Sequence, residues 1–158
     1  MRIVIHWMHL MAAVTWIGGM LFLSLVAVPV LKPRTADPGQ AELFRAMARR
    51  FRLIVWGAIG VLLITGPLLV TRHGWGLFEP GQWPSALRIK VSLVALLLLL
   101  TGAHDLVLGP RVGKLVRMPV EQRSPCDRRL IGVTPWLARG SLFLALAVLA
   151  VALSIARP

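Results

Sequence analysis

Four long apolar segments dominate the pattern of hydrophobic and polar positions along the chain. Residues 3–31 and 53–71 contain no Asp, Glu, Lys or Arg, and residues 91–105 and 140–156 are nearly as apolar. A helix needs about 20 apolar residues to cross a bilayer, and backbone amides cannot stay unpaired in lipid. The pattern therefore predicts four transmembrane helices, at about residues 3–31, 53–71, 86–108 and 137–156.

These helices predict an all-α fold, an integral membrane four-helix bundle that forms a single transmembrane domain over residues 1–158. No internal repeat is evident. The first apolar segment is too long for the core of a typical cleaved signal peptide, and Arg2 alone is a weak positive region before it. We therefore expect this segment to be retained as a helix.

The basic residues are distributed unevenly between the connecting segments. The formal net charge is +12, and thirteen of the eighteen lysines and arginines lie within residues 32–52 and 109–139. Cytoplasmic loops carry such an excess of Lys and Arg, so both termini are predicted on the outer side of a bacterial inner (cytoplasmic) membrane. The charge then reflects topology and contact with anionic lipid, and it does not indicate a nucleic-acid partner.

The connecting segments carry turn signals and amphipathic stretches. The stretch "LFRAMARRFR" is predicted either to lie along the lipid headgroups or to extend the second helix. The segment over residues 110–135 is long and basic and is expected to be partly disordered. Cys126 is the single cysteine, so neither a disulfide framework nor a Cys-x-x-Cys metal site is predicted.

Two stripes of polar residues run along the predicted spans. Because each helical residue advances by about 100°, His6 and His9 share one face of the first helix, and Lys90 and His104 share one face of the third. Ionisable groups in a span nearly always face the protein interior. His9 and His104 are separated by roughly 20 Å along the membrane normal, which predicts separate outer and inner sites.

Each of these residues also has a purely structural interpretation. His6 and His9 are close enough to a helix end to be interfacial, Lys90 can extend its amine to the headgroups, and His73 is expected to be a solvated loop residue. His104 and Asp105 form either part of an inner site or a structural pair that closes the bundle against Arg139. Gly18 and Gly19 predict close helix packing or room for a flat cofactor.

Imidazole ligands suit haem iron, copper and zinc. Haem b is favoured, because an axial histidine, aromatic neighbours, small residues and outer cations are all present. Copper is the alternative, although Met8 projects almost opposite to His6 and the two converge poorly. The candidate cofactor-binding residues are His9, His6, His104, Lys90, Arg88 and Trp16, and the candidate metal ligands are His9, His6, His104 and His73.

Three segments resemble a known superfamily of small inner-membrane proteins. "HLMAAVTWIGGMLFL", "RRFRLIVWGAIGVLLITGPLLV" and "LRIKVSLVALLLLLTGAHDLVLGPRV" are similar to the CopD (copper-resistance protein D) superfamily, which includes the HemJ-type protoporphyrinogen oxidases. The resemblance implies a four-helix unit, with copper handling in the CopD type and haem binding with protoporphyrinogen oxidation in the HemJ type. It also implies that His9 is the haem or metal ligand and Lys90 its polar partner.

The chain departs from both branches of this superfamily. HemJ-type proteins usually carry a Tyr-His pair late in the third helix, where Leu100 and Thr101 stand here. CopD-type proteins tend to carry an Asn-Arg pair about where His104 and Asp105 stand, although the "LGPRV" segment fits that branch better. The resemblance therefore supports the superfamily more than either activity.

The leading hypothesis is a haem-b redox protein that moves electrons across the membrane or to quinone. The alternatives are CopD-type copper binding or transport, a HemJ-like protoporphyrinogen oxidase, and a non-catalytic subunit of a larger respiratory or photosynthetic complex. Whether the chain is an enzyme is left open, and an enzyme of this kind would be an oxidoreductase. The expected partners are the lipid bilayer, a quinone or redox protein, and a larger complex or a second copy of the chain.

Overall fold

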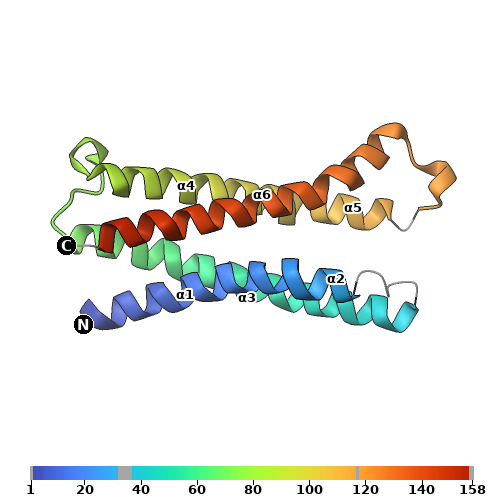
Figure 1. Ribbon diagram of the computed structural model, residues 1–158, viewed down its shortest axis with the longest axis horizontal. Coiled ribbons are helices and arrows are strands. Elements are labelled where there is room, and N and C mark those ends of the chain that lie inside the picture. Colours follow the sequence, from blue (N-terminus) through green and yellow to red (C-terminus); the bar gives the residue numbers. More distant parts are fainter. Residues whose placement is uncertain (1, 32–36, 117, 157–158) are drawn as a thin grey trace. The chain divides into compact units, whose positions relative to one another are not determined.

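The computed structural model describes residues 2–31, 37–116 and 118–156, and these residues are predominantly helical, with no strand among them (Figure 1). The predicted all-α fold class is confirmed. In chain order the elements are α1 (Arg2–Phe22), the π-helical turn η1 (Leu23–Ala27), α2 (Val28–Leu31), α3 (Pro38–Arg72), the 3₁₀ turn η3 (Pro80–Gln82), α4 (Ser85–Gly102), the π-helical turn η4 (Ala103–Leu108), α5 (Gly109–Leu115), the 3₁₀ turn η5 (Val120–Gln122) and α6 (Pro125–Ala156).

Four helical segments are long and apolar enough to cross a membrane, as the sequence predicts. Large apolar side chains on them are exposed, among them Ile64 (66%), Leu99 (71%) and Phe143 (72%). Apolar surface on this scale is unfavourable in water and suits contact with acyl chains. The four segments are Ile3–Val30, Gly39–Arg72, Ser85–Leu115 and Pro125–Ile155.

The second of these segments is longer than the apolar stretch that predicts it. α3 begins at Pro38, where the Asp37 carboxylate accepts a hydrogen bond from the Gly39 amide at 2.9 Å. This contact satisfies one of the amides that have no partner within the first turn of a helix. The basic stretch before the apolar segment is therefore an extension of the second helix, which is one of the two arrangements that the sequence allows.

The fourth helix begins at Pro125, well before the predicted residue 137, because a capping box starts it. The Ser124 hydroxyl accepts a hydrogen bond from the Asp127 amide at 3.2 Å, and the Asp127 carboxylate accepts one from the Ser124 amide at 3.0 Å. This reciprocal pairing satisfies two amides at the helix start. Much of the segment that was expected to be partly disordered is consequently helical.

Each π-helical turn directly precedes a proline in its helix. η1 ends two residues before Pro29, and η4 ends two residues before Pro110. Proline has no amide hydrogen, and its ring clashes with the carbonyl four residues earlier in an α-helix. A wider turn relieves that clash, so each chain segment stays helical through its proline.

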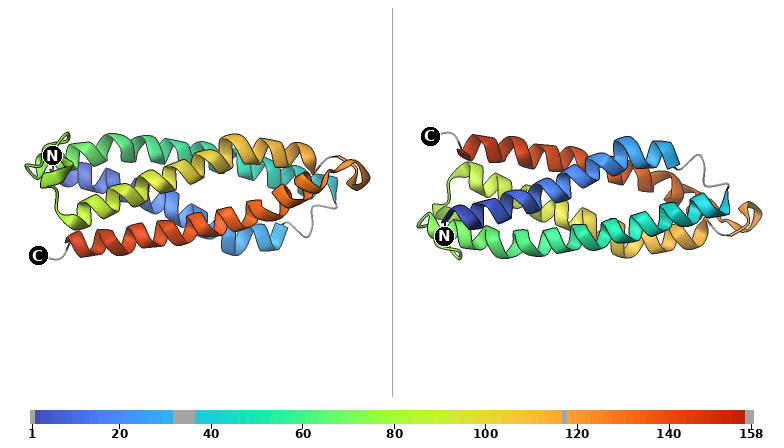
Figure 2. Two further views of the ribbon diagram at one scale, coloured as in Figure 1. Left: turned by 90° about the horizontal axis from the view of Figure 1, so that it is seen from above. Right: turned by 90° about the horizontal axis from the view of Figure 1, so that it is seen from below.

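The chain divides into two compact units, Met1–Pro84 (unit 1) and Ser85–Pro158 (unit 2). In unit 1, α1 and α3 run antiparallel and side by side (Figure 2). Trp16 and Ile59 are buried, and the space beside Gly19 holds the ring of Phe51. Apart from its chain neighbours and the backbone of its own helix, no atom of the described residues lies within 4 Å of where the Cβ of Gly18 would stand, so only Gly19 of the glycine pair serves close packing.

Unit 2 is built mainly from α4 and α6. Leu97 on α4 is buried, as are Ser141 and Ala145 on α6. The Ser141 hydroxyl donates to the Leu137 carbonyl at 3.0 Å, so this buried polar group is satisfied within its own helix. Small residues of this kind allow two helices to approach closely in a bilayer.

Candidate functional site

His9 is held between the two helices of unit 1 by a hydrogen bond to Thr65. Thr65 is buried, and its hydroxyl donates to the Val61 carbonyl at 2.7 Å. Because a hydroxyl has one proton to donate, its oxygen is the acceptor for His9 Nδ1–H at 2.8 Å. In the neutral ring, Nε2 then carries the lone pair through which a histidine binds metal.

The backbone of α3 also shapes the surroundings of this ring. A Cβ placed on Gly66 would lie 3.8 Å from His9 Cε1, within van der Waals distance. The half-buried His9 ring therefore lies against the one residue of this turn that lacks a side chain. Within the "TGP" run of residues 65–67, Thr65 supplies the hydrogen-bond acceptor for His9, and Gly66 has no side chain beside the ring. Neither residue was predicted from the sequence to belong to the site.

A second group of rings lies at the end of the same unit: His6, His73 and Trp75, here called the outer cluster. The His6 and His73 ring centroids are 6.2 Å apart at an interplanar angle of 69°. His73 stacks on Trp75 with centroids 5.2 Å apart and an angle of 15°. His73, which the sequence suggested to be a solvated loop residue, is exposed but ordered within this cluster.

A helix-terminating motif places these rings. His73 is the C-cap residue directly after Arg72, the last residue of α3, and Gly74 follows with φ of +82°, a conformation that favours glycine. The Gly74 amide donates to the Thr71 carbonyl at 3.0 Å and the Trp75 amide to the Val70 carbonyl at 3.4 Å. This is the Schellman pattern that ends many helices, and it turns the chain so that the indole covers His73.

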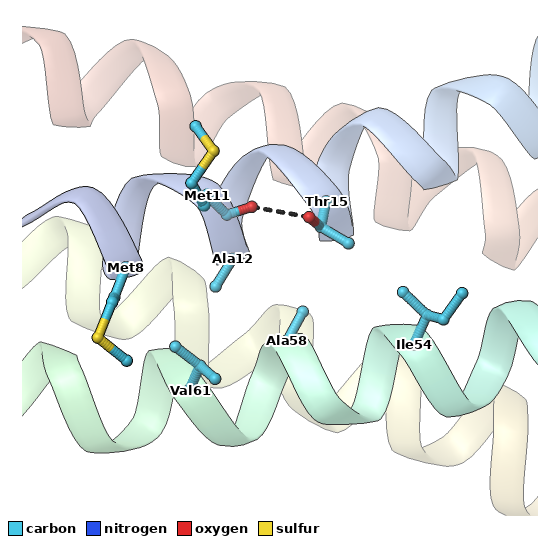
Figure 3. Close-up of a pocket in the computed structure, with 7 residues that line it drawn as sticks. All are labelled: Met8, Met11, Ala12, Thr15, Ile54, Ala58 and Val61. Carbon is cyan, nitrogen blue, oxygen red and sulfur yellow. Dashed lines mark hydrogen bonds between the residues drawn. The ribbon is translucent and has the colours of Figure 1, made fainter.

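A groove of about 360 Å³ lies between α1 and α3 in the same unit (Figure 3). The Met8 side chain extends toward Val61, whereas Met11 points away from α3. The two sulfur atoms therefore do not converge on one point, as copper(I) ligation by both would require. The groove is lined by Met8, Met11, Ala12, Thr15, Ile54, Ala58 and Val61.

Three buried side-chain polar atoms in the described part of the chain have no hydrogen-bond partner: Trp16 Nε1, Trp56 Nε1 and Thr101 Oγ1. Trp16, on α1, is only 3% exposed. An unpaired donor in an apolar environment is unfavourable by about 1–3 kcal/mol, so an acceptor on a bound group or partner chain would stabilise it. Trp56 was not singled out from the sequence.

In unit 2, His104 and Asp105 lie in the π-helical turn η4 and contact each other. His104 Nδ1–H donates to Asp105 Oδ1 at 2.9 Å, and both side chains are partly exposed. Arg139 lies over the Trp136 ring, 4.9 Å from its centroid. The other predicted residues of this unit are Lys90, which is half-buried, and Arg88, which is exposed.

No three His, Cys, Asp or Glu side chains among residues 2–31, 37–116 and 118–156 are grouped so that they could hold one metal ion. The four histidines are instead distributed over three places. His9 is hydrogen-bonded to Thr65, His6 and His73 are in contact in the outer cluster, and His104 is hydrogen-bonded to Asp105. A metal held by protein atoms in the described part would have at most two such ligands.

Four long apolar helices in two hairpins define a multi-pass membrane protein in a lipid bilayer. The chain belongs to the family described as "Domain of unknown function (DUF4149)", which matches residues 11–119. It is also 32% identical over 105 residues to an uncharacterized protein of Aquifex aeolicus (strain VF5), a match that covers 66% of this chain and 68% of that protein. No solved structure gives a significant match.

Proposed function

We propose that this protein is a redox protein of the bacterial inner membrane that binds one b-type haem through His9. The observation that carries the proposal is the His9–Thr65 hydrogen bond at 2.8 Å. Histidines that bind metal usually donate their other ring N–H to a fixed acceptor, which sets the tautomer and the ring orientation. The resemblance to the CopD and HemJ-type proteins assigns the ligand role to the same residue.

Other residues of unit 1 fit a haem in their chemistry. The buried Trp16 indole N–H has no acceptor among the described residues, and Gly66, which has no side chain, lies beside the His9 ring. Arg72, the last residue of α3, is a cation of the kind that pairs with propionates. A bound haem would supply one-electron chemistry at its iron. The apolar helices would exclude water, and a quinone or a redox protein would exchange the electron.

The arrangement of ligands favours haem over copper or zinc at His9. A structural zinc ion uses four protein ligands, whereas a haem iron needs only one or two axial ligands from the protein. No suitable three-residue group occurs in the described part of the chain, and the Met8 and Met11 side chains diverge. A single oriented imidazole is sufficient only for the haem.

The test is an absorption spectrum of the full chain, purified in detergent from haem-replete cells, before and after reduction with dithionite. We expect a Soret band that His9→Ala abolishes and that the control His104→Ala keeps. Circular dichroism checks that both variants are helical. A folded wild-type chain without a Soret band, or a band unchanged in His9→Ala, would overturn the proposal.

A further inference from the structure

The outer cluster contains two imidazoles that the haem proposal does not use. His73 Nδ1–H donates to the Leu69 carbonyl at 2.7 Å. Since a carbonyl oxygen can only accept, the proton is on Nδ1 and the lone pair of the neutral ring is on Nε2. The stacked Trp75 indole fixes the plane of the same ring. A backbone carbonyl on the second ring nitrogen is typical of histidines that bind metal.

His6 approaches this ring from the other helix. Its centroid is 6.2 Å from that of His73. A zinc–imidazole bond is about 2.0–2.1 Å long, so the centroids of two rings on one ion lie within roughly 6.5 Å of each other. The observed separation is inside that limit, so the two rings are close enough to bind the same ion.

We propose that His6 and His73 form a two-imidazole site for a late first-row divalent ion, such as Cu²⁺ or Zn²⁺. Imidazole nitrogen suits these ions, whereas Mg²⁺ and Ca²⁺ prefer oxygen. Both histidines are exposed and lie near an end of their helices, so we expect the ion to enter from the aqueous phase at this end of unit 1. Water completes its coordination, because no third His, Cys, Asp or Glu of the described residues joins the pair.

This site is independent of the haem proposal, since His9 belongs to neither pair of rings in the outer cluster. Open coordination positions are a property of sites that exchange or react, whereas structural zinc sites are closed by four protein ligands. We therefore assign the outer cluster to reversible capture of the ion and not to folding. Removal of the ion should leave the helical content unchanged.

The experiment uses the full chain, purified with an affinity tag that contains no histidine and placed in lipid nanodiscs. Cu²⁺ is titrated against a competing chelator, and electron paramagnetic resonance counts the coordinated imidazoles. We expect one Cu²⁺ per chain on two imidazoles. His6→Gln or His73→Gln should weaken binding by at least about tenfold and remove one imidazole from the spectrum. Zn²⁺ should compete for the site.

His104→Gln is the matched control, because it removes a partly exposed histidine from unit 2. It should leave the Cu²⁺ affinity unchanged, and the outer-cluster variants should keep any Soret band. Equal affinity in wild type and His73→Gln would overturn the inference, as would a spectrum with fewer than two imidazoles. The inference would also fail if the chain binds no Cu²⁺ and His6→Gln lowers the thermal stability equally with and without Cu²⁺. In that case the outer cluster would be only a packing contact between the two helices.

Discussion

At the scale of single residues, the Thr65 hydroxyl determines which nitrogen of His9 can act as a ligand. Sequence periodicity predicts that His6 and His9 share a face, because that depends on one helix alone. It does not predict Thr65 as the partner, since the register between two antiparallel helices depends on packing that neither pattern contains. His73 was likewise predicted to be a solvated loop residue, because its position near His6 depends on how α3 ends, which the periodicity does not show.

Thr65→Val should weaken haem binding without removing the ligand. Valine has a similar shape but no oxygen to accept the His9 Nδ1–H bond of 2.8 Å, so the ring loses its fixed tautomer and orientation. Loss of such a partner typically lowers metal affinity about 10–100-fold. Titration of apoprotein with haemin, followed at the Soret band, measures the change.

Thr71→Val is the control for that experiment. Its hydroxyl also bonds to carbonyls of α3, at 3.1 Å and 3.3 Å, and it has no histidine partner. The control should bind haem as the wild type does. Equal affinities in all three proteins would mean that the His9–Thr65 bond only joins two helices.

At the scale of helices, the two units share a plan that the sequence did not reveal. "SLVAVP" in unit 1 and "DLVLGP" in unit 2 both end a π-helical turn and lead into a proline. His9 and Lys90 each stand twenty residues before that proline. His9 in one polar stripe and Lys90 in the other therefore occupy equivalent positions relative to the proline of their helix. The two segments share too few identical residues for this relation to be recognised from the sequence.

Helix ends show most clearly where prediction from sequence failed. The apolar content of the spans is a local property, so four spanning helices could be predicted. The start of α6 is set by the Ser124 and Asp127 cap, a short polar signal that lies far outside the apolar segment. The Gly74 turn that brings Trp75 onto His73 was likewise present in the sequence, as glycine directly after a helix.

Gly19→Ala should destabilise the packing of α1 on α3. The new Cβ would overlap the Phe51 ring, so either the ring moves or the helices separate. Overpacking of this kind usually lowers the free energy of unfolding by about 1–3 kcal/mol. Unfolding of the full chain in mixed micelles, followed by circular dichroism, measures the loss.

Gly18→Ala is the matched control, because no atom of the described residues other than its chain neighbours and its own helix backbone lies within 4 Å of its Cβ position. It should be close to neutral. In the Phe51→Ala background, Gly19→Ala should cost little, since the ring that it overlaps is absent, and the double-mutant cycle would then report the contact. Equal destabilisation by the two glycine variants would instead point to a general effect of side chains on α1.

At the scale of the whole molecule, the charge distribution predicts which aqueous phase reaches the outer cluster. With the basic segments cytoplasmic, the outer cluster and both termini face the outer phase, and the segment that holds Cys126 faces the cytoplasm. This orientation is a prediction from charge, because four apolar helices alone are compatible with either direction.

Cys126 makes the orientation measurable, since it is the single cysteine and is exposed. A membrane-impermeant maleimide should leave it unlabelled in spheroplasts and label it after permeabilisation. A cysteine at Phe78, which is 96% exposed in the segment after α3, tests the other side of the membrane. Phe78→Cys in a Cys126→Ser background should be labelled in intact spheroplasts.

Phe78 is five residues after His73, so the same reagent also identifies the aqueous phase from which an ion enters the outer cluster. Labelling of Cys126 in intact spheroplasts would place that cluster in the cytoplasm, and capture of external metal would be excluded.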